Sequence, residues 1–339
     1  MSPTLEEVAR LAGVSRSTVS RVINDQPNVR PETRERVWQT VRKSGYRPHA
    51  VARSLVTNRT QIIGIVIPET VTTLFTDPFF PLLLRGATKA CNAHQYQLML
   101  SLFTARADER EMYDRVLRNG YLDGVIVASA SSDSPLIPKL LRDGVLVVSV
   151  GRYPDDRVPY VDVDNVGGAR MAVEHLIRLG HRRVGTITGR LDMAHAQDRL
   201  SGYRQALEAH HIPLDDDLIA EGDYTEGGGM TAMRRMLKAS PTAVFAASDT
   251  MAIGALKVLH EVGLRVPDDV ALVGFDAIPV SGVVQPPLTT VRQPIEHLGA
   301  MAVDVLVGLL ESLPPVDHPT QRIILPTELA VRGSCGALK

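Results

Sequence analysis

Five polar residues near the N-terminus are of types that bind DNA: Arg16, Ser17, Ser20, Arg21 and Asn24. At helical spacing they share the outer face of a short helix, and this face carries two arginines and no acidic residue. Arg contacts phosphates or guanine edges, and Ser and Asn contact phosphates or adenine edges. The pattern favours a helix that enters the major groove. The alternative is an ordinary helical hairpin with a polar outer face.

Two helices joined by a tight turn must position these residues. The first helix has a capping-box spacing between Thr4 and Glu7 and ends at Gly13, which tolerates a left-handed conformation. Ser15 can cap the second helix. The apolar face of the first helix has residues three and four apart: Leu5, Val8, Ala9 and Ala12. This arrangement predicts a helix-turn-helix with its second helix in the major groove.

The stretch T-L-E-E-V-A-R-L-A-G-V-S-R-S-T-V-S-R-V-I-N, continued by G-Y-R-P-H-A-V-A-R-S-L, resembles the DNA-binding head of the lactose-repressor (LacI/GalR) family. The resemblance implies a dimer that binds a pseudo-palindromic double-stranded operator. We expect Arg16, Ser17 and Arg21 to set base preference. The residues expected mainly to hold phosphates are Ser15, Ser20, Asn24 and Asn28.

Residues 48–59 correspond to the hinge helix of that family. In the family, two copies of this helix pair in the minor groove, where a leucine wedges between bases at a central CG step and kinks the DNA. That leucine corresponds to Leu55, with Ala52 and Arg53 beside it. His49 departs from the usual Asn and caps a helix less well. A plain interdomain linker is the alternative interpretation.

Composition predicts a soluble globular protein of two or three domains, with 339 residues, 44% hydrophobic and 22% charged. Residues 1–59 hold 11 Lys and Arg against 5 Asp and Glu, whereas the remainder holds 26 against 33. Attraction to phosphate is therefore concentrated in the head. The two cysteines predict no disulfide framework and no metal site. No leader or membrane-length apolar run is visible, so we expect a cytoplasmic protein without membrane contact.

From residue 62, short apolar runs alternate with amphipathic helical patterns, as in parallel sheets covered by helices. The expected strands include 62–67, 124–128 and 184–187, and the expected helices include 86–94 and 108–119. The number of such units suggests two sheets, with a ligand between them at the carboxyl ends of the strands.

This body resembles the periplasmic-binding-protein fold that the family uses as its sensor, through stretches such as S-D-T-M-A-I-G-A-L and V-P-D-D-V-A-L-V-G-F-D. The expected fold is an all-α helix-turn-helix head plus an α/β sensor of two doubly wound parallel-sheet subdomains. The expected domains are the head (1–47), the hinge (48–59), an N-subdomain (60–161 and 292–322) and a C-subdomain (162–291 and 323–337).

Several residues have side chains suited to a sugar. Phe75 and Phe79 offer flat faces that stack on sugar rings, and carboxylates accept hydrogen bonds from hydroxyl groups. Glu69, Asp77 and Asp192 supply such carboxylates. We expect the neighbouring Phe80 to serve in packing.

The family resemblance adds further effector-binding residues, matched position by position: Arg152, Arg199, Tyr224, Ser248, Asp276 and Gln293. Asp249 is better interpreted as a helix cap. The family often has a second acid after Asp276, where this chain has Ala277. That contact is therefore expected to be absent.

These residues make the candidate cleft rich in acids and free of Lys, which favours a neutral sugar over a sugar phosphate or a purine. The stretches I-P-E-T-V-T-T-L-F-T-D-P-F-F and E-G-D-Y-T-E-G-G-G resemble actinobacterial-type regulators of cello-oligosaccharide and β-glucoside use. We therefore expect a dimeric repressor that a sugar such as cellobiose releases from its operator. A response to an α-glucoside such as maltose is an alternative, and co-repression is not excluded.

Two other classes of protein share such a body. A sugar-binding transport protein would have no DNA-binding head, and an α/β enzyme would need a catalytic pair. The sequence has no P-loop, no H-E-x-x-H motif and no dinucleotide-binding loop. We therefore expect no enzyme activity, cofactor or metal. The chain ends at Lys339 without a terminal leucine heptad, which favours a homodimer over a tetramer.

Overall fold

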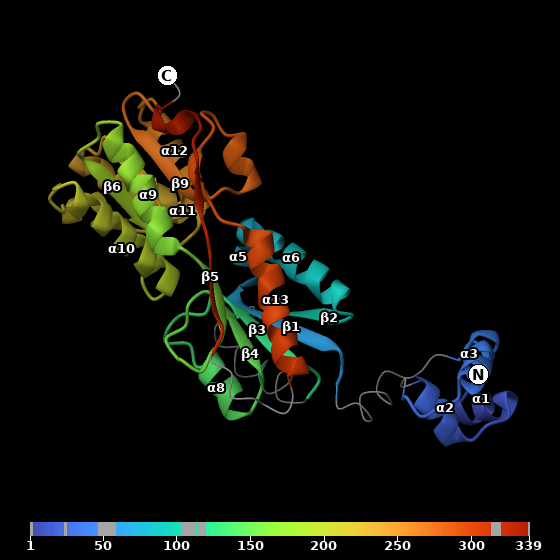
Figure 1. The fold of residues 1–339 in the computed structure, drawn as a ribbon. Coiled ribbons are helices and arrows are strands. Elements are labelled where there is room, and N and C mark those ends of the chain that lie inside the picture. Colours follow the sequence, from blue (N-terminus) through green and yellow to red (C-terminus); the bar gives the residue numbers. More distant parts are fainter. Residues whose placement is uncertain are drawn as a thin grey trace. The chain divides into compact units, whose positions relative to one another are not determined.

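The computed structural model describes residues 3–23, 26–46, 59–103, 113, 120–312 and 320–337, without the side chains of residues 69–73 and 103. The chain divides between Gln61 and Ile62 into two compact units, which are described separately (Figure 1). Most of the expected hinge, and the expected helix over residues 108–119 apart from residue 113, lie outside the described residues.

Three helices form the first unit: α1 (Leu5–Ala12), α2 (Arg16–Ile23) and α3 (Pro31–Ser44). The predicted capping box is confirmed, because the Thr4 hydroxyl accepts from the Glu7 N–H and the Glu7 carboxylate accepts from the Thr4 N–H. Gly13 ends α1 with a φ of +64°. The core of the unit takes buried valines from all three helices: Val8, Val19, Val22, Val37 and Val41.

Six parallel strands form the first sheet of the second unit, in the order β11-β5-β4-β3-β1-β2. They are β1 (Ile62–Thr70), β2 (Gln97–Phe103), β3 (Gly124–Ala128), β4 (Val147–Val150), β5 (Tyr160–Val163) and β11 (Arg322–Leu325). The helices associated with it are α5 (Val71–Thr76), α6 (Phe79–Ala93), α8 (Leu136–Arg142) and α13 (Ile295–Glu311). Ile126 of β3 packs with α6 and α13, and Val125 and Val127 pack with α8. Both faces are covered, which explains the uninterrupted apolar runs.

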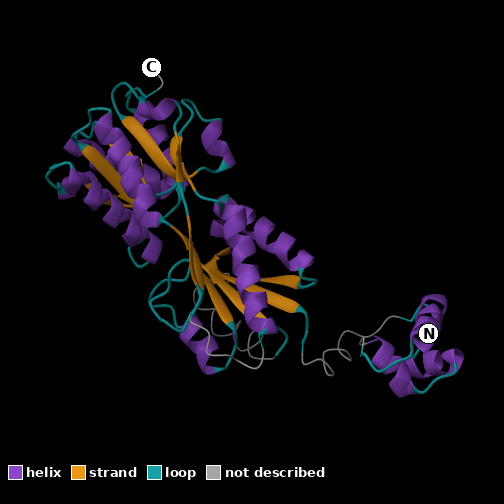
Figure 2. Cartoon of the chain, viewed as in Figure 1, coloured by secondary structure: helices purple, strands orange, loops and turns teal. Residues whose placement is uncertain are grey.

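The second sheet also has six strands, in the order β12-β10-β9-β8-β6-β7. They are β6 (Val184–Thr188), β7 (Ile219–Glu221), β8 (Ala243–Ala246), β9 (Ala271–Asp276), β10 (Thr289–Arg292) and β12 (Glu328–Ala330). Strand β12 is antiparallel to β10, and the other pairings are parallel. The helices α9 (Asn165–Arg178) and α10 (Ala194–Ala209) pack on one face, and α11 (Glu226–Met236) and α12 (Asp249–Glu261) on the other (Figure 2).

The chain passes from one sheet to the other after β5, after β10 and after β11. Strand β5 continues to Val163 and β11 to Leu325, so these two crossings lie slightly beyond the boundaries expected after residues 161 and 322. The helix expected over 86–94 begins earlier, at Phe79, whose N–H donates to the Asp77 carboxylate at 3.0 Å.

Helices α6 and α13 approach each other closely at two glycines. A Cβ atom on Gly86 would overlap the carbonyl oxygen of Glu296, and one on Gly299 would overlap the carbonyl oxygen of Leu83. Only a residue without a side chain fits at these two positions.

We therefore predict that Gly299→Ala lowers the free energy of unfolding by about 1–3 kcal/mol, because the added methyl group forces the two helices apart. Gly308→Ala is the matched control, since Gly308 lies on the same helix with no heavy atom within 4 Å of an added Cβ. It should leave stability unchanged or raise it by up to about 1 kcal/mol through helix propensity. Urea unfolding measures both, and equal stabilities would contradict the prediction.

Candidate functional site

The polar face of α2 is exposed in the first unit. Arg16, Ser17 and Arg21 are exposed, and Ser20 is half-buried. The Ser15 hydroxyl accepts from the Thr18 N–H at 3.1 Å, so it caps the helix as predicted. The polar face of α2 is therefore exposed within this unit.

Arg16 has an acidic partner that the helix pattern did not reveal. Its guanidinium lies 3.1 Å from the carboxylate of Glu6, which comes from α1, and both side chains are more than half exposed. Exposed ion pairs contribute little to stability. A phosphate or a guanine edge can therefore replace Glu6 at low cost.

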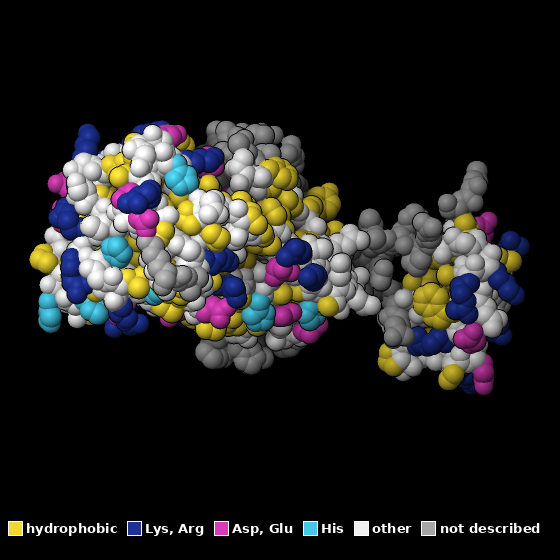
Figure 3. All heavy atoms as spheres, turned by 90° about the horizontal axis from the view of Figure 1, so that it is seen from above, with side chains coloured by type: hydrophobic (Ala, Val, Ile, Leu, Met, Phe, Trp, Pro, Cys, Tyr) yellow, Lys and Arg dark blue, Asp and Glu magenta, His cyan; other side chains and the backbone are white. Residues whose placement is uncertain are grey.

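The other predicted DNA contacts are divided between the described residues and the rest of the chain. Asn28 is exposed in the loop before α3. Lys and Arg side chains appear on the visible surface of this unit, interspersed with acidic ones (Figure 3). Four predicted residues lie outside the described residues: Asn24, Ala52, Arg53 and Leu55.

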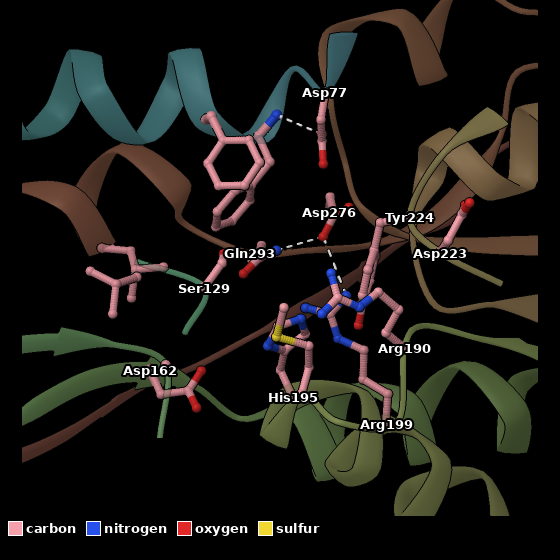
Figure 4. A pocket seen from close by; sticks show the side chains of 16 residues that line it. Asp77, Ser129, Asp162, Arg190, His195, Arg199, Asp223, Tyr224, Asp276 and Gln293 are labelled. Carbon is pink, nitrogen blue, oxygen red and sulfur yellow. Dashed lines mark hydrogen bonds and ion pairs between the residues drawn. The ribbon is translucent and has the colours of Figure 1, made fainter. Parts of the chain in front are cut away.

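A cavity lies between the two sheets of the second unit (Figure 4). It contains about 820 Å³ of empty space, part of it open to solvent. Ser129 follows β3, Asp162 lies near the end of β5, and Asp276 ends β9. The cavity thus lies at the carboxyl ends of parallel strands, where open α/β sheets bind ligands.

The described residues that line the cavity come from both sheets and their loops. They are Asp77, Phe79, Phe80, Ser129, Val150, Gly151, Asp162, Arg190, Met193, His195, Arg199, Asp223, Tyr224, Asp276, Gln293 and Leu298. Six of the eleven predicted effector residues are among them: Asp77, Phe79, Arg199, Tyr224, Asp276 and Gln293. Their contact with an effector stays a prediction.

Arg199 is a buried cation held by several elements. Its side chain is 6% exposed. Its Nε donates to Asn165 Oδ1 at 2.9 Å, and its Nη1 donates to the Ala247 carbonyl at 2.5 Å. The guanidinium also lies 3.7 Å from the centre of the Phe275 ring and 3.6 Å from Asp276 Oδ1. These partners offset the cost of removing the charge from water and fix its position at the cavity.

Asp276 faces Arg199 and also accepts from Gln293 Nε2 at 2.5 Å (Figure 4). Burial raises the pKa of Asp276 well above its usual value, and the carboxyls of Asp249 and Asp77 raise it further. Arg199 and the Gln293 hydrogen bond oppose these effects. A hydroxyl group that entered here would meet a polar group with little water around it, which strengthens a hydrogen bond.

The backbone turn after β9 orients Asp276, and hydrogen bonds to the Asp249 carboxylate stabilise this turn. Asp276 and Ala277 have φ values of +113° and +56°, in the region that favours glycine. The Asp249 carboxylate accepts from the Ile278 N–H at 2.9 Å and from the Thr290 hydroxyl at 2.5 Å. Burial raises the pKa of Asp249 to about 7. Its hydrogen bonds offset part of the strain at this turn.

The cap of α12 is not the predicted residue Asp249 but Ser248, whose predicted contact with the effector stays a prediction. Ser248, predicted to bind the effector, is buried, does not line the cavity and caps α12 by accepting from the Met251 N–H. Asp249, predicted to be the cap, instead reaches Thr290 and Ile278. Both side chains suit a helix N-terminus, so only the tertiary contacts decide between them.

Tyr224 points into the cavity with a hydroxyl that is buried and has no hydrogen-bond partner among the described residues. Its φ is +68°, and a side chain at Gly189 would overlap its ring. An unpaired buried hydroxyl is costly, and a bound ligand can satisfy it.

His195 lies beside Tyr224, with 5.2 Å between the ring centres. Its pKa falls to about 3, chiefly through burial and also through the positive charges of Arg199 and Arg190. The imidazole is therefore neutral near pH 7. A neutral imidazole carries one donor and one acceptor, which suits hydroxyl groups.

Two phenylalanine rings form an apolar wall. Phe79 and Phe80 meet edge to face, with ring centres 5.4 Å apart. Phe80 is buried as expected of a packing residue, but it also lines the cavity. Phe75 is 73% exposed and does not line the cavity, contrary to expectation.

Two other predicted effector residues with described side chains, Arg152 and Asp192, do not line the cavity. Arg152 pairs with Asp198 at 2.8 Å, while its N–H donates to the Asp162 carboxylate. Asp192 pairs with Arg190 at 2.6 Å. The side chain of Glu69 is not among those described. Arg152 and Asp192 thus support cavity residues, and their charges are already paired.

Several lining residues were not predicted from the sequence, although their positions just after predicted strands could have identified them. Ser129 directly follows β3, and Arg190 and His195 lie shortly after β6. Side chains that follow the carboxyl end of a buried parallel strand are candidates on that ground alone. The other missed polar residues are Asp162 and Asp223.

Two further features of the described residues bear on the type of site. No group of three or more His, Cys, Asp or Glu side chains among them could hold a metal ion. No helix in the described part of the chain is long and apolar enough to span a membrane.

Comparisons with known proteins agree with this two-part organisation. Residues 4–49 match the family described as bacterial regulatory proteins, lacI family, and residues 173–335 match the periplasmic binding protein-like domain. The HTH-type transcriptional regulator CelR of Thermobifida fusca is 43% identical over 98% of this chain and 98% of its own length.

Solved structures are also similar over nearly the whole chain, among them the following two. A transcriptional regulator CelR–cellobiose complex has a TM-score of 0.78 at 39% identity, covering 98% of this chain and 99% of the other. The lac repressor dimer bound to operator and the anti-inducer ONPF has a TM-score of 0.82 at 28% identity, covering 99% of both. Because the similarity includes both the helix-turn-helix and the two-sheet unit, the chain belongs to the lacI family of bacterial regulatory proteins.

Proposed function

We propose that this protein is a transcriptional repressor that binds a pseudo-palindromic operator as a homodimer and is released by a neutral β-linked glucose oligosaccharide such as cellobiose. The observation that carries the proposal is the cavity between the two sheets, which combines an apolar wall with buried polar groups. The similar CelR structure is a complex with cellobiose. We further propose that the protein acts in the cytoplasm and has a binding role without catalysis, which the similarity to the transcriptional regulator CelR supports.

The chemistry of the lining suits a sugar ring. Such a ring has apolar C–H faces and a rim of hydroxyl groups. Phe79 and Phe80 supply an apolar surface, and Gln293, Asp276 and Tyr224 supply polar groups. Binding sites for small molecules typically combine apolar walls with a few placed polar groups.

The charge of the lining favours a neutral ligand. Four aspartates line the cavity against two arginines. Arg190 and Arg199 already have carboxylate neighbours, Asp192 and Asp276 respectively. A phosphate group would therefore find no arginine among the described lining residues without a carboxyl neighbour, whereas hydroxyl groups can pair with carboxyl and guanidinium groups alike.

Arg199 connects the cavity to the segment where the chain crosses between the sheets. It binds Asn165, the first residue of α9, and Asn165 Nδ2 donates to the Asp162 carboxylate at 2.9 Å. Asp162 lies in β5 of the first sheet. A sugar that repositions Arg199 would thus act on both sheets. We propose that the resulting change in the angle between them lowers the affinity for DNA.

Fluorescence anisotropy tests this function with the full chain and a labelled palindrome that has a central CG step. We expect cellobiose to release the operator, and maltose or glucose 6-phosphate not to do so. Release by maltose alone would reassign the protein to α-glucosides, and tighter binding with cellobiose would make the sugar a co-repressor. Failure to bind any such palindrome would contradict the repressor function.

Arg21→Ala should weaken operator binding by about 1–3 kcal/mol, because Arg21 lies on the exposed face of α2. Arg42→Ala removes the same charge from α3, where Arg42 pairs with Glu35 at 3.2 Å. This control should lose much less affinity. Titration of labelled operator at one salt concentration compares the two, and equal losses would show that α2 is not the reading helix.

Tyr224→Phe should weaken cellobiose binding roughly three- to tenfold, the size expected for one neutral hydrogen bond. The stability of the sugar-free protein should stay the same or rise, because the substitution removes an unpaired buried hydroxyl. Tyr121→Phe, at an exposed tyrosine outside the cavity, is the control and should change neither property. Calorimetric titration and thermal melting measure the two effects, and unchanged affinity would remove Tyr224 from the binding site.

A further inference from the structure

A second cavity adjoins the first and contains about 590 Å³ of empty space, part of it open to solvent. Ser129, Arg190 and Met193 line both cavities, so the two spaces meet at these residues. Figure 4 shows Ser129 and Arg190 among the side chains of the first cavity. A ligand too long for the first cavity would extend past them.

We propose that this second cavity is an additional sugar subsite, so that the protein binds a cello-oligosaccharide of three or more units more tightly than cellobiose. This inference rests on the proposed function. It adds the preferred chain length of the ligand and a set of residues outside the first cavity.

The lining of the second cavity mixes polar and apolar groups and has no aromatic ring among its described residues. Hydroxyl groups come from Ser131 and Ser134, and a carboxylate comes from Asp133. Pro68 and Pro135 add small apolar surfaces. A pyranose unit held here would be bound mainly through its hydroxyl rim, with water nearby, and should therefore contribute less than a unit in the first cavity.

The charges of the second cavity also favour a neutral unit. Arg190 binds the Asp192 carboxylate through Nε at 3.1 Å and Nη2 at 2.6 Å. Asp133 adds a second negative charge. The arginine is thus neutralised locally, and a phosphate or sulfate group would gain little by binding.

Hydrogen bonds join the two walls of the second cavity, one from each sheet. Ser132, in the loop after β3, donates to the Asp192 carbonyl from both its N–H and its hydroxyl, each at 3.1 Å. Within the same loop the Ser131 hydroxyl donates to Asp133 Oδ1 at 2.6 Å. The subsite is therefore formed before a ligand arrives, which reduces the entropy cost of binding. The walls come from both sheets. A sugar unit in the second cavity should therefore favour the same angle between the sheets as a sugar in the first cavity.

Calorimetric titration of the full chain with cellobiose and cellotriose tests this inference. The wild-type protein should bind cellotriose roughly three- to tenfold more tightly than cellobiose. In Ser131→Trp, an indole would fill the second cavity, so the cellotriose advantage should disappear while the cellobiose affinity stays within about twofold. Thr231→Trp places the same bulk at an exposed position of α11 that lines neither cavity, and it should behave as the wild type does.

Asp133→Ala provides a second test if the indole prevents folding, as thermal melting would reveal. It removes a polar group and little volume, and it should reduce the cellotriose advantage without affecting cellobiose. Equal affinities for the two sugars in the wild-type protein would overturn the subsite, as would a cellotriose advantage that survives both Ser131→Trp and Asp133→Ala. If neither sugar binds, the proposed function itself fails, which is a different outcome from the loss of chain-length preference alone.

Discussion

The sensor depends on the burial of one cation. Arg199 has almost no exposure to water, and a charge in that position must find its partners inside the protein. It takes them from three places: Asn165 at the start of α9, the carbonyl of Ala247 after β8, and Asp276 at the end of β9. Removing one partner of a buried ion pair typically costs about 3–5 kcal/mol, so these elements are strongly held to one another.

The cavity is a consequence of how the two sheets are connected. Each sheet is parallel apart from β12, and the chain crosses between them after β5, β10 and β11. Since the strands of both sheets end at the cavity, loops from distant parts of the sequence converge there. The same crossings allow a ligand that touches both sheets to change the angle between them, which is how we propose that sugar binding is communicated to the DNA-binding unit.

Some polar side chains line the cavity, and others stabilise the residues that line it. Asp192 binds the lining residue Arg190, and Asp198 binds Arg152, whose N–H donates to the lining residue Asp162. Asp249 accepts from the N–H of Ile278, two residues after the lining residue Asp276. Arg152 was expected in the cleft because of its position in the family pattern, and it contributes instead through its N–H to Asp162 and its pair with Asp198. Tyr224 differs from all of these, since its buried hydroxyl has no hydrogen-bond partner among the described residues.

The sequence by itself determined the helix-turn-helix, the family and the alternation of strands and helices. Its signals are local, because the Thr4–Glu7 capping box and the turn at Gly13 determine the backbone only within a few residues of their own positions. The tertiary structure decided which side chains face the cavity. Phe79 lines it and Phe75 does not, and Ser248 caps the N-terminus of α12. Such choices could not be predicted, because the cavity joins groups far apart in the chain, and a side chain's direction there is set by packing and charge pairing that no short stretch encodes.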